Sequence, residues 1–313
     1  MIVTVTLTPA LDKTVILPDF QVDQVNRIQS LRLDAGGKGI NVSKVLRSLG
    51  TDSLATGILG GGTGRFIEEK LREADIACDF AWVPQDTRTN LKVVDPVRHT
   101  NTDINEPGSQ VSAAVLESVF QKAAAAAGPG DIVVLAGKAP SGADPDIFGL
   151  WIRRLQALGI SVYLDADGDL LAEGVKACPA LVKPNDQELS RLMGRELQDI
   201  PAVAEAAAEL LRRGVGTVAV SLGGDGALFA AAGQMLRGRG LKVQVQSTVG
   251  AGDSMMAALA HGAQKGMPFR DTCALALAVS AAAVTTPGTQ PADAETVQTL
   301  LEQVVLEELP ADF

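Results

Sequence analysis

Apolar positions divide most of the chain into short strands that alternate with longer helices. After residue 110, apolar runs typical of buried strands, such as Ile132–Leu135, alternate with amphipathic patterns of helical period, such as Val111–Ala127. Alternation of this kind is typical of a parallel sheet with helices on both faces. The pattern predicts an α/β fold, a three-layer sandwich around a mostly parallel central sheet.

The expected elements span almost the whole chain. In the first hundred residues they are a strand at Ile2–Leu7, a helix between Gly39 and Gly50, a strand at Ser53–Leu59 and a helix at Arg65–Ala74. From residue 111 onward the helices are Val111–Ala127, Pro145–Leu158, Leu170–Ala177, Gln187–Met193 and Ala202–Arg213, and the strands are Ile132–Leu135, Ile160–Asp165, Ala180–Lys183 and Thr217–Ser221. A glycine-rich hairpin through Gly223–Gly226 and three further helices complete the chain.

Two polar, alternating segments do not fit a sheet that is buried on both faces. They lie near residues 14–33 and 87–106, where short alternating pieces leave one face of each strand polar. Such strands suit a small sheet that is packed on one side only. We therefore expect an α/β core of residues 1–11, 34–86 and 107–313, and a discontinuous β-sheet lid of residues 12–33 and 87–106.

Composition and charge narrow the classes of partner. The 313 residues are 46% apolar and 20% charged, as in an ordinary protein with a large core. Lys and Arg number 27 and Asp and Glu 37, a net charge of −10, which argues against nucleic-acid or anionic-membrane binding. Any anionic ligand must then be held by local basic groups. No segment resembles a signal peptide or a membrane span, so we expect a cytoplasmic protein.

Scarce residue types exclude several kinds of catalysis. The chain has two histidines, His99 and His261, which rules out a histidine-rich zinc site. No G-x-S-x-G motif accompanies them, so a Ser-His-Asp triad is not indicated. The three cysteines form no C-x-x-C pattern, which argues against zinc and thiol chemistry.

The strongest candidate motif is Ser247–Ser254, with the sequence Ser-Thr-Val-Gly-Ala-Gly-Asp-Ser at the start of a helix. Glycines in a strand-to-helix turn let backbone N–H groups converge on an anion, which the helix dipole also favours. Asp253 beside such a site suggests a base that accepts a proton from an attacking hydroxyl. The alternative is that Asp253 only complements the helix dipole.

The second motif is the loop Gly36-Gly37-Lys38-Gly39-Ile40-Asn41. It is not a Walker A loop, because Gly39 rather than Ser or Thr follows the lysine. Its glycines permit close approach of the backbone to a ligand, while Lys38 and Asn41 supply a charge and an amide. The alternative is simply a glycine-rich helix start.

A third motif, Lys183-Pro184-Asn185-Asp186-Gln187-Glu188, has two interpretations that are compatible with each other. Asn185 followed by Glu188 three residues later is a capping-box pattern. Both side chains also suit the neighbourhood of a hydrated Mg²⁺, which prefers carboxylate and water oxygens.

Two residues in the expected lid region are weaker candidates. Arg88 could grip a phosphate in a bidentate manner or could be a solvated strand residue. Asp12, shortly after Pro9, could hydrogen-bond sugar hydroxyls or could merely terminate the first strand.

These motifs, in this order, resemble those of the PfkB carbohydrate kinases of the ribokinase-like superfamily. The resemblance rests on Asp12, the Gly36–Asn41 loop, Arg88, Lys183–Glu188, Ser221–Gly223 and Thr248–Asp253, and it covers essentially the whole chain. The motifs around Asp12, Thr87–Asn90, Thr102–Glu106 and Ser247–Ser254 are most similar to those of members that phosphorylate ketohexose phosphates. Fructose 1-phosphate is the substrate implied first, and tagatose 6-phosphate is close behind.

The resemblance also implies a role for each motif residue, with ATP as co-substrate and Mg²⁺ as cofactor. Asp253 would be the base, and Gly250, Ala251 and Gly252 would form the anion hole for the transferring phosphoryl group. Asp12, Gly37 and Asn41 would bind sugar hydroxyls, Lys38 and Arg88 would bind the sugar phosphate, and Asn90 would also contact the substrate. The nucleotide would contact Lys183, Asn185, Ser221, Gly223, Gly226 and Thr248, and Mg²⁺ would be held through water by Asn185 and Glu188.

Three matters stay open at this level. Lys138 stands where the family usually has a small polar residue, so it could add a phosphate contact or shift substrate preference. A non-catalytic sugar-phosphate sensor with the same fold is an alternative, although a pure binder has no need of Asp253. Unpaired polar edges of the lid strands suggest a homodimer formed through the lid.

Overall fold

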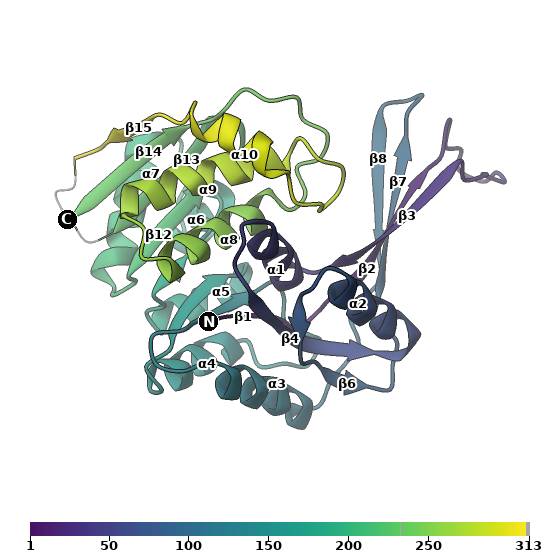
Figure 1. Cartoon of the computed structure of the whole chain (residues 1–313), viewed down its shortest axis with the longest axis horizontal. Coiled ribbons are helices and arrows are strands. Elements are labelled where there is room, and N and C mark those ends of the chain that lie inside the picture. Colours follow the sequence, from purple (N-terminus) through teal and green to yellow (C-terminus); the bar gives the residue numbers. More distant parts are fainter. Residues whose placement is uncertain (232, 311–313) are drawn as a thin grey trace.

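The computed structural model describes residues 1–231 and 233–310, and its centre is a large sheet (Figure 1). Within these residues eleven strands form this sheet, with β6 (Ala81–Val83) paired to β4 beside the main path. The order along that path is β15 (Leu306–Glu308), β14 (Gln234–Arg239), β13 (Gly226–Ala231), β12 (Thr217–Ser221), β11 (Leu181–Val182), β10 (Ser161–Asp165), β9 (Ile132–Ala136), β1 (Ile2–Thr6), β4 (Ser53–Gly60) and β5 (Ala77–Cys78). Pairing is parallel from β12 to β5 and antiparallel from β12 to β15. The predicted α/β fold with a mostly parallel sheet is confirmed.

Helices pack on both faces of the central sheet. Their bounds are α1 (Lys38–Ser48), α2 (Gly61–Glu73), α3 (Ala113–Ala126), α4 (Ile147–Gln156), α5 (Gly168–Lys176), α6 (Asp186–Met193), α7 (Ile200–Arg212), α8 (Ala251–Gln264), α9 (Phe269–Ala283) and α10 (Ala294–Leu301). Most lie within a few residues of their expected positions, whereas α2 begins four residues earlier, at the glycine-rich turn after β4.

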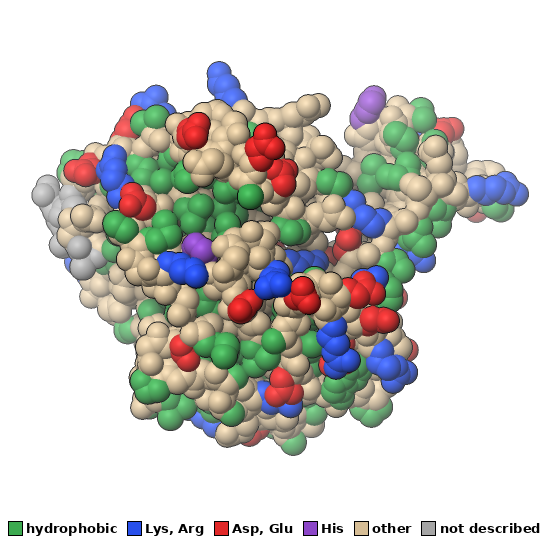
Figure 2. All heavy atoms as spheres, viewed as in Figure 1, with side chains coloured by type: hydrophobic (Ala, Val, Ile, Leu, Met, Phe, Trp, Pro, Cys, Tyr) green, Lys and Arg blue, Asp and Glu red, His purple; other side chains and the backbone are tan. Residues whose placement is uncertain are grey.

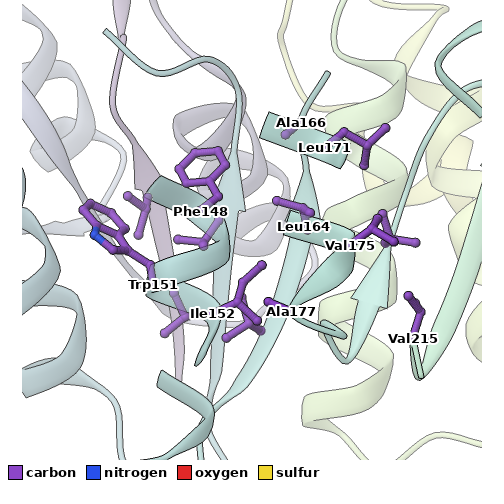
Figure 3. Close-up of a cluster of buried hydrophobic side chains, with 14 of the residues drawn as sticks. Phe148, Trp151, Ile152, Leu164, Ala166, Leu171, Val175, Ala177 and Val215 are labelled. Atoms are coloured by element: carbon purple, nitrogen blue, oxygen red, sulfur yellow. The ribbon is translucent and has the colours of Figure 1, made fainter. Parts of the chain in front are cut away.

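The alternation of side chains along the strands explains the two cores. Val133 and Leu135 of β9 point into the cluster formed with helices α3 to α7, while Ile132 and Val134 point into the cluster formed with α1, α8 and α9. Figure 3 shows part of the first cluster, where Trp151 of α4 and neighbouring apolar side chains pack against the sheet. Strands buried on both faces read as continuous apolar runs, which is why the sequence predicts them well.

A separate four-stranded sheet, called here the small sheet, projects from the rest of the molecule (Figure 1). Its strand order is β3 (Ser30–Gly36), β2 (Ala10–Ile16), β7 (Thr89–Asp95) and β8 (Thr100–Asn105). These strands come from the two segments expected to form a lid, and β7 and β8 pair with each other as an antiparallel hairpin. However, β2 and β3 reach beyond residues 12 and 33 into the expected core, so the division into core and lid stays a prediction.

Several elements near the edges of the central sheet differ from expectation. Strands β5, β6, β14 and β15 were not predicted, because they are short or lie in polar sequence. The sequence predicts a strand directly before the turn at Thr248–Gly250, but the structure has none there. Strand β14 ends at Arg239, and residues 240–249 are irregular. Among the described residues, no helix combines the length and apolar character needed to span a bilayer.

Candidate active site

The first turn of α8 is built to receive an anion. Gly250, the residue before the helix, has φ 87°, a left-handed conformation that a residue with a Cβ adopts only under strain. Ser254 N donates to Gly250 O at 2.8 Å, and the preceding N–H groups of the first turn have no acceptor within the helix. Together with the helix dipole they favour a negative charge in front of Gly250–Gly252.

Asp253 lies in this first turn with 6% of its surface exposed. Asn41 of α1 donates from Nδ2 to Asp253 Oδ2 at 2.8 Å, so the glycine-rich loop and the α8 motif meet here. Burial, and then the like charge of Asp165, raise the pKa of Asp253 to about 6 against the opposing effect of this hydrogen bond. A carboxylate with that pKa is well suited to accept a proton near neutral pH.

Two lysines meet on the carboxylate of Asp165, which is 1% exposed at the end of β10. Lys38 Nζ lies 2.8 Å from Asp165 Oδ1, and Lys183 Nζ lies 3.3 Å from Asp165 Oδ2. Burial would raise the pKa of Asp165, but the two ammonium groups outweigh it and hold that pKa below its ordinary value. For Lys38, burial acts to lower the pKa, and the attraction of Asp165 more than offsets it, so the pKa lies above its ordinary value.

Lys183 also touches the helix start. It is 4% exposed, and a Cβ built on Gly252 would lie 3.1 Å from its Nζ. A buried ammonium group therefore lies directly beside the first turn of α8, where it adds to the positive end of the helix dipole.

The small sheet contributes a polar cluster around Asp12. Strand register places Asp12 of β2 between Asp34 of β3 and Asn90 of β7, and Asn90 Nδ2 donates to Asp12 Oδ1 at 3.0 Å. A Cβ on Gly36 would lie 2.0 Å from Asp12 Oδ2, so a larger residue there would displace the Asp12 carboxylate. Burial raises the pKa of Asp12 above its ordinary value, against the hydrogen bond from Asn90. Asp12 does not terminate the first strand, because β1 ends at Thr6.

Two basic residues link the small sheet to the helices. Lys44 of α1 donates from Nζ to the carbonyl of Ala35, and burial lowers its pKa against the nearby carboxylates of Asp34 and Asp12. Arg32 of β3 pairs with Asp34 at 2.7 Å, and its Nη2 lies 2.2 Å from where a Cβ of Gly288 would stand. The small sheet therefore contacts the loop after α9.

Arg88 lies at the base of the small sheet, directly before β7. Its guanidinium donates to the carbonyls of Thr8 at 3.4 Å and Glu106 at 3.3 Å. It lines a pocket together with Thr8, Pro9, Gly108 and Ser109. Lys38 does not line this pocket, and its ammonium group pairs with Asp165.

Of the residues expected to contact a nucleotide, Lys183, Asn185, Ser221 and Gly223 lie just after or at the ends of β11 and β12, while Gly226 begins β13 and Thr248 lies in the loop before α8. Asn185 forms an isolated parallel bridge with Ser221, and Ser221 N donates to Pro184 O at 3.1 Å. Gly223 has φ 58° with open space around it, and Thr248 is exposed. Gly226 has a separate structural reason to be glycine, because a Cβ there would lie 2.1 Å from Gly238 O of β14.

The expected capping box is present at the start of α6. Glu188 N donates to Asn185 Oδ1 at 2.7 Å, and Asn185 N donates to Glu188 Oε2 at 2.9 Å. Among the described residues no group of three or more Asp, Glu, His and Cys side chains could hold a metal. Mg²⁺ in phosphoryl-transfer enzymes often uses one or two carboxylates with water and substrate phosphates. Glu188, with its second oxygen outside the cap, fits such a water-mediated site.

The family model described as pfkB family carbohydrate kinase matches residues 5–296. The chain belongs to the PfkB family of carbohydrate kinases. The 1-phosphofructokinase of Vibrio cholerae is 36% identical over 97% of this chain and 95% of its own. The 1-phosphofructokinase of Rhodobacter capsulatus is 36% identical over 99% of this chain and 98% of its own. That of Escherichia coli is 37% identical over 90% of each chain. Phosphofructokinase-2 of Escherichia coli, solved with substrates and products, superposes with a TM-score of 0.92 at 29% identity, covering 96% of this chain and 98% of that one.

The protein is therefore a sugar kinase, a phosphotransferase of a family that uses ATP as co-substrate. Within this PfkB kinase, Asp253, Asn41, Lys38 and Lys183 gather at the start of α8, while Asp12 and Asn90 pair on the small sheet. The individual roles of these residues stay predictions. The side chain of Lys138 is 72% exposed, and its Nζ lies 3.9 Å from Asp167 Oδ2.

Sequence reasoning missed three residues of this kinase's site: Asp165, Lys44 and Arg32. Asp165 carried a usable signal, because a charged residue ends a buried strand at the edge where the carboxyl ends of parallel strands meet. Lys44 lies one helical turn after Ile40, but nothing in the sequence around it distinguishes it from a surface lysine. Arg32 alternates with apolar residues like any solvated strand residue.

Proposed function

We propose that this kinase transfers the γ-phosphoryl group of ATP to fructose 1-phosphate and forms fructose 1,6-bisphosphate. The printed name of the relatives from Vibrio cholerae, Rhodobacter capsulatus and Escherichia coli, 1-phosphofructokinase, supports the choice of sugar. The observation that carries the chemistry is the buried Asp253 in the first turn of α8, with Asn41 and two lysines around it.

The proton of the acceptor hydroxyl passes to Asp253. Its Oδ2 already accepts from Asn41, so Oδ1 is the oxygen left to receive the proton. The hydroxyl oxygen forms a bond to the γ-phosphorus, the bond from that phosphorus to the bridging oxygen breaks, and ADP leaves. The N–H groups at Gly250–Gly252 face the charge that spreads over the phosphoryl oxygens.

The small sheet supplies the sugar site. Asp12 and Asn90, paired at 3.0 Å, bind sugar hydroxyls together with Gly37 and Asn41. Arg88, outside the Asp253 cluster, holds the phosphate already on the sugar, since its guanidinium can bind phosphate in a bidentate manner. In this arrangement the small sheet covers the sugar as a lid.

The nucleotide lies along the loops after β11 and β12. Asn185, Ser221 and Gly223 line it, together with Lys183, Thr248 and the backbone at Gly226. Asn185 and Glu188 hold Mg²⁺ through water, and this ion neutralises charge on the ATP phosphates when bound.

Turnover of a sugar panel tests this proposal. ADP release is measured with fructose 1-phosphate, tagatose 6-phosphate, fructose 6-phosphate and fructose. We expect the highest kcat/KM for fructose 1-phosphate. A higher value for tagatose 6-phosphate would replace the proposed substrate by the alternative one. Binding of a sugar phosphate without ADP release would instead identify a sensor.

We also propose that two copies of the chain associate through the small sheet. Register places Leu33, Lys13, Leu91 and Ile104 in one row on the face opposite Asp12, and the apolar Leu33 and Ile104 at its two ends are 36% and 53% exposed. Figure 2 shows hydrophobic side chains along the projecting arm. Exposed apolar side chains on this projecting sheet favour a second copy of the chain as their cover. Sedimentation should give a dimeric mass, and Ile104→Asp a monomeric one; a monomeric wild type contradicts this assembly.

A further inference from the structure

Asp165 has no role in the functions discussed so far, yet it is among the most buried charged residues of the chain. It is 1% exposed, and each of its carboxylate oxygens faces a different lysine, Lys38 at 2.8 Å and Lys183 at 3.3 Å. The backbone fixes its place, because Gly137 N donates to Asp165 O at 2.8 Å and Lys183 N donates to Leu164 O at 3.0 Å. The lysines come from separate elements, the start of α1 and the end of β11.

Both ammonium groups lie near the first turn of α8. Lys183 Nζ would be 3.1 Å from a Cβ on Gly252. The charge of Lys38 acts on Asp253, and its stem passes 3.8 Å from where a Cβ of Gly137 would stand. One carboxylate between two ammonium groups leaves one positive charge in surplus. It also reduces the repulsion that would drive two adjacent ammonium groups apart.

We propose that Asp165 is a positioning residue that holds Lys38 and Lys183 as a pair facing the transferring phosphoryl group. This inference rests on the proposed phosphoryl transfer at Asp253. It reassigns Lys38, which the family resemblance associates with the phosphate already on the sugar. A lysine has a long, flexible side chain, and fixing two of them before reaction avoids that ordering cost in the transition state.

The test compares Asp165→Asn with wild type in steady-state kinetics. The substitution keeps the shape of the side chain and removes its charge. We expect kcat to fall about 10–100-fold, as for a misplaced catalytic group, with the KM for the sugar phosphate within about threefold of wild type. Asp95→Asn is the control, because Asp95 is equally buried at 2% exposed but lies at the far end of β7. We expect that variant to lose stability and keep kcat.

A double-mutant cycle separates positioning from general damage. Lys38→Met should lower kcat with little change in the KM for the sugar phosphate. Asp165→Asn should lower kcat by a clearly smaller factor in the Lys38→Met background than in wild type, because one of the two lysines that Asp165 holds is already gone. Fully multiplicative losses would overturn the proposal. If Asp165→Asn does not fold, Lys38→Met alone decides.

Two further results would overturn the proposal. The first is a rise in the KM for the sugar phosphate with unchanged kcat in Lys38→Met, which would return Lys38 to the sugar phosphate. The second is an Asp165→Asn variant that only requires more Mg²⁺ for half-maximal rate, which would make Asp165 a metal-site residue. All measurements use the sugar phosphate that wild type turns over fastest. A different preferred sugar would therefore contradict the proposed substrate without affecting this test.

Discussion

Asp253→Asn should make the protein more stable and far less active. The substitution is nearly isosteric, and the new side-chain oxygen can still accept the hydrogen bond from Asn41 that Asp253 Oδ2 accepts at 2.8 Å. What it removes is a negative charge buried at 6% exposure beside Asp165. The fold at present carries that charge for its chemistry and at a cost in stability.

The pKa gives the size and sign of this cost. The pKa of Asp253 is raised from 3.8 to about 6, a shift of about two units, which corresponds to about 3 kcal/mol. Because the folded state holds its proton more tightly than the unfolded state, stability from this group is present below pH 3.8 and is lost as pH rises to about 6. Above that pH Asp253 is ionised, and the folded state is less stable by about 3 kcal/mol than it would be with a neutral side chain at this position. Asn pays no such cost, so we expect a gain of up to about 3 kcal/mol at pH 8.

Urea unfolding at pH 8 and at pH 4 measures the gain, and ADP release measures the activity. The gain in the free energy of unfolding should shrink at pH 4, where wild-type Asp253 is largely protonated. Turnover should fall about 10²–10⁴-fold if Asp253 is the general base. A destabilised variant at pH 8 would refute the electrostatic reasoning. Near-normal turnover would remove Asp253 from the mechanism.

Three other outcomes are expected. The kcat of wild type should fall as pH drops through about 6, by about tenfold per unit well below it, because protonated Asp253 cannot act as a base; a flat profile down to pH 5 would contradict this. Arg88→Ala should raise the KM for the sugar phosphate about 10–100-fold through loss of charge-assisted hydrogen bonds; an equal effect on the unphosphorylated sugar would show that Arg88 does not recognise phosphate. Gly226→Ala should destabilise the fold by about 2 kcal/mol or more, because its Cβ would lie 2.1 Å from Gly238 O at a φ of 98°; an unchanged urea midpoint would contradict the assigned packing.

Much of the fold could be predicted because its central strands are buried on both faces. Strands such as β9 and β10 are continuous apolar runs, and the helices between them have a clear amphipathic period. The strands that were missed are short, as β5 with Ala77–Cys78, or polar, as β14 with Gln234–Arg239. Their pairing depends on neighbours distant in the sequence, and local periodicity does not report those neighbours.

The site was predictable where a backbone requirement marks the sequence. Gly250 stands at a left-handed φ before α8, and Asn185 with Glu188 forms the cap that their spacing predicts. Side chains whose role depends on a distant partner leave no such mark. Asp165 meets Lys38 across 127 positions of sequence, and only the parallel sheet brings the two together. The same holds for Arg32, whose contact with Gly288 links the small sheet to the loop after α9.

The charges around the site explain how an acidic protein can receive anions. A chain of net charge −10 was expected to need local basic groups, but these groups do not form an unpaired positive patch. Lys38 and Lys183 share Asp165, and Arg32 pairs with Asp34. The surplus of positive charge is small and fixed in position, and the N–H groups of α8 add to it. Binding then depends on oriented, partly buried donors, which salt screens less than exposed charges. The affinity for sugar phosphate should therefore respond to ionic strength more weakly than binding to an open basic surface.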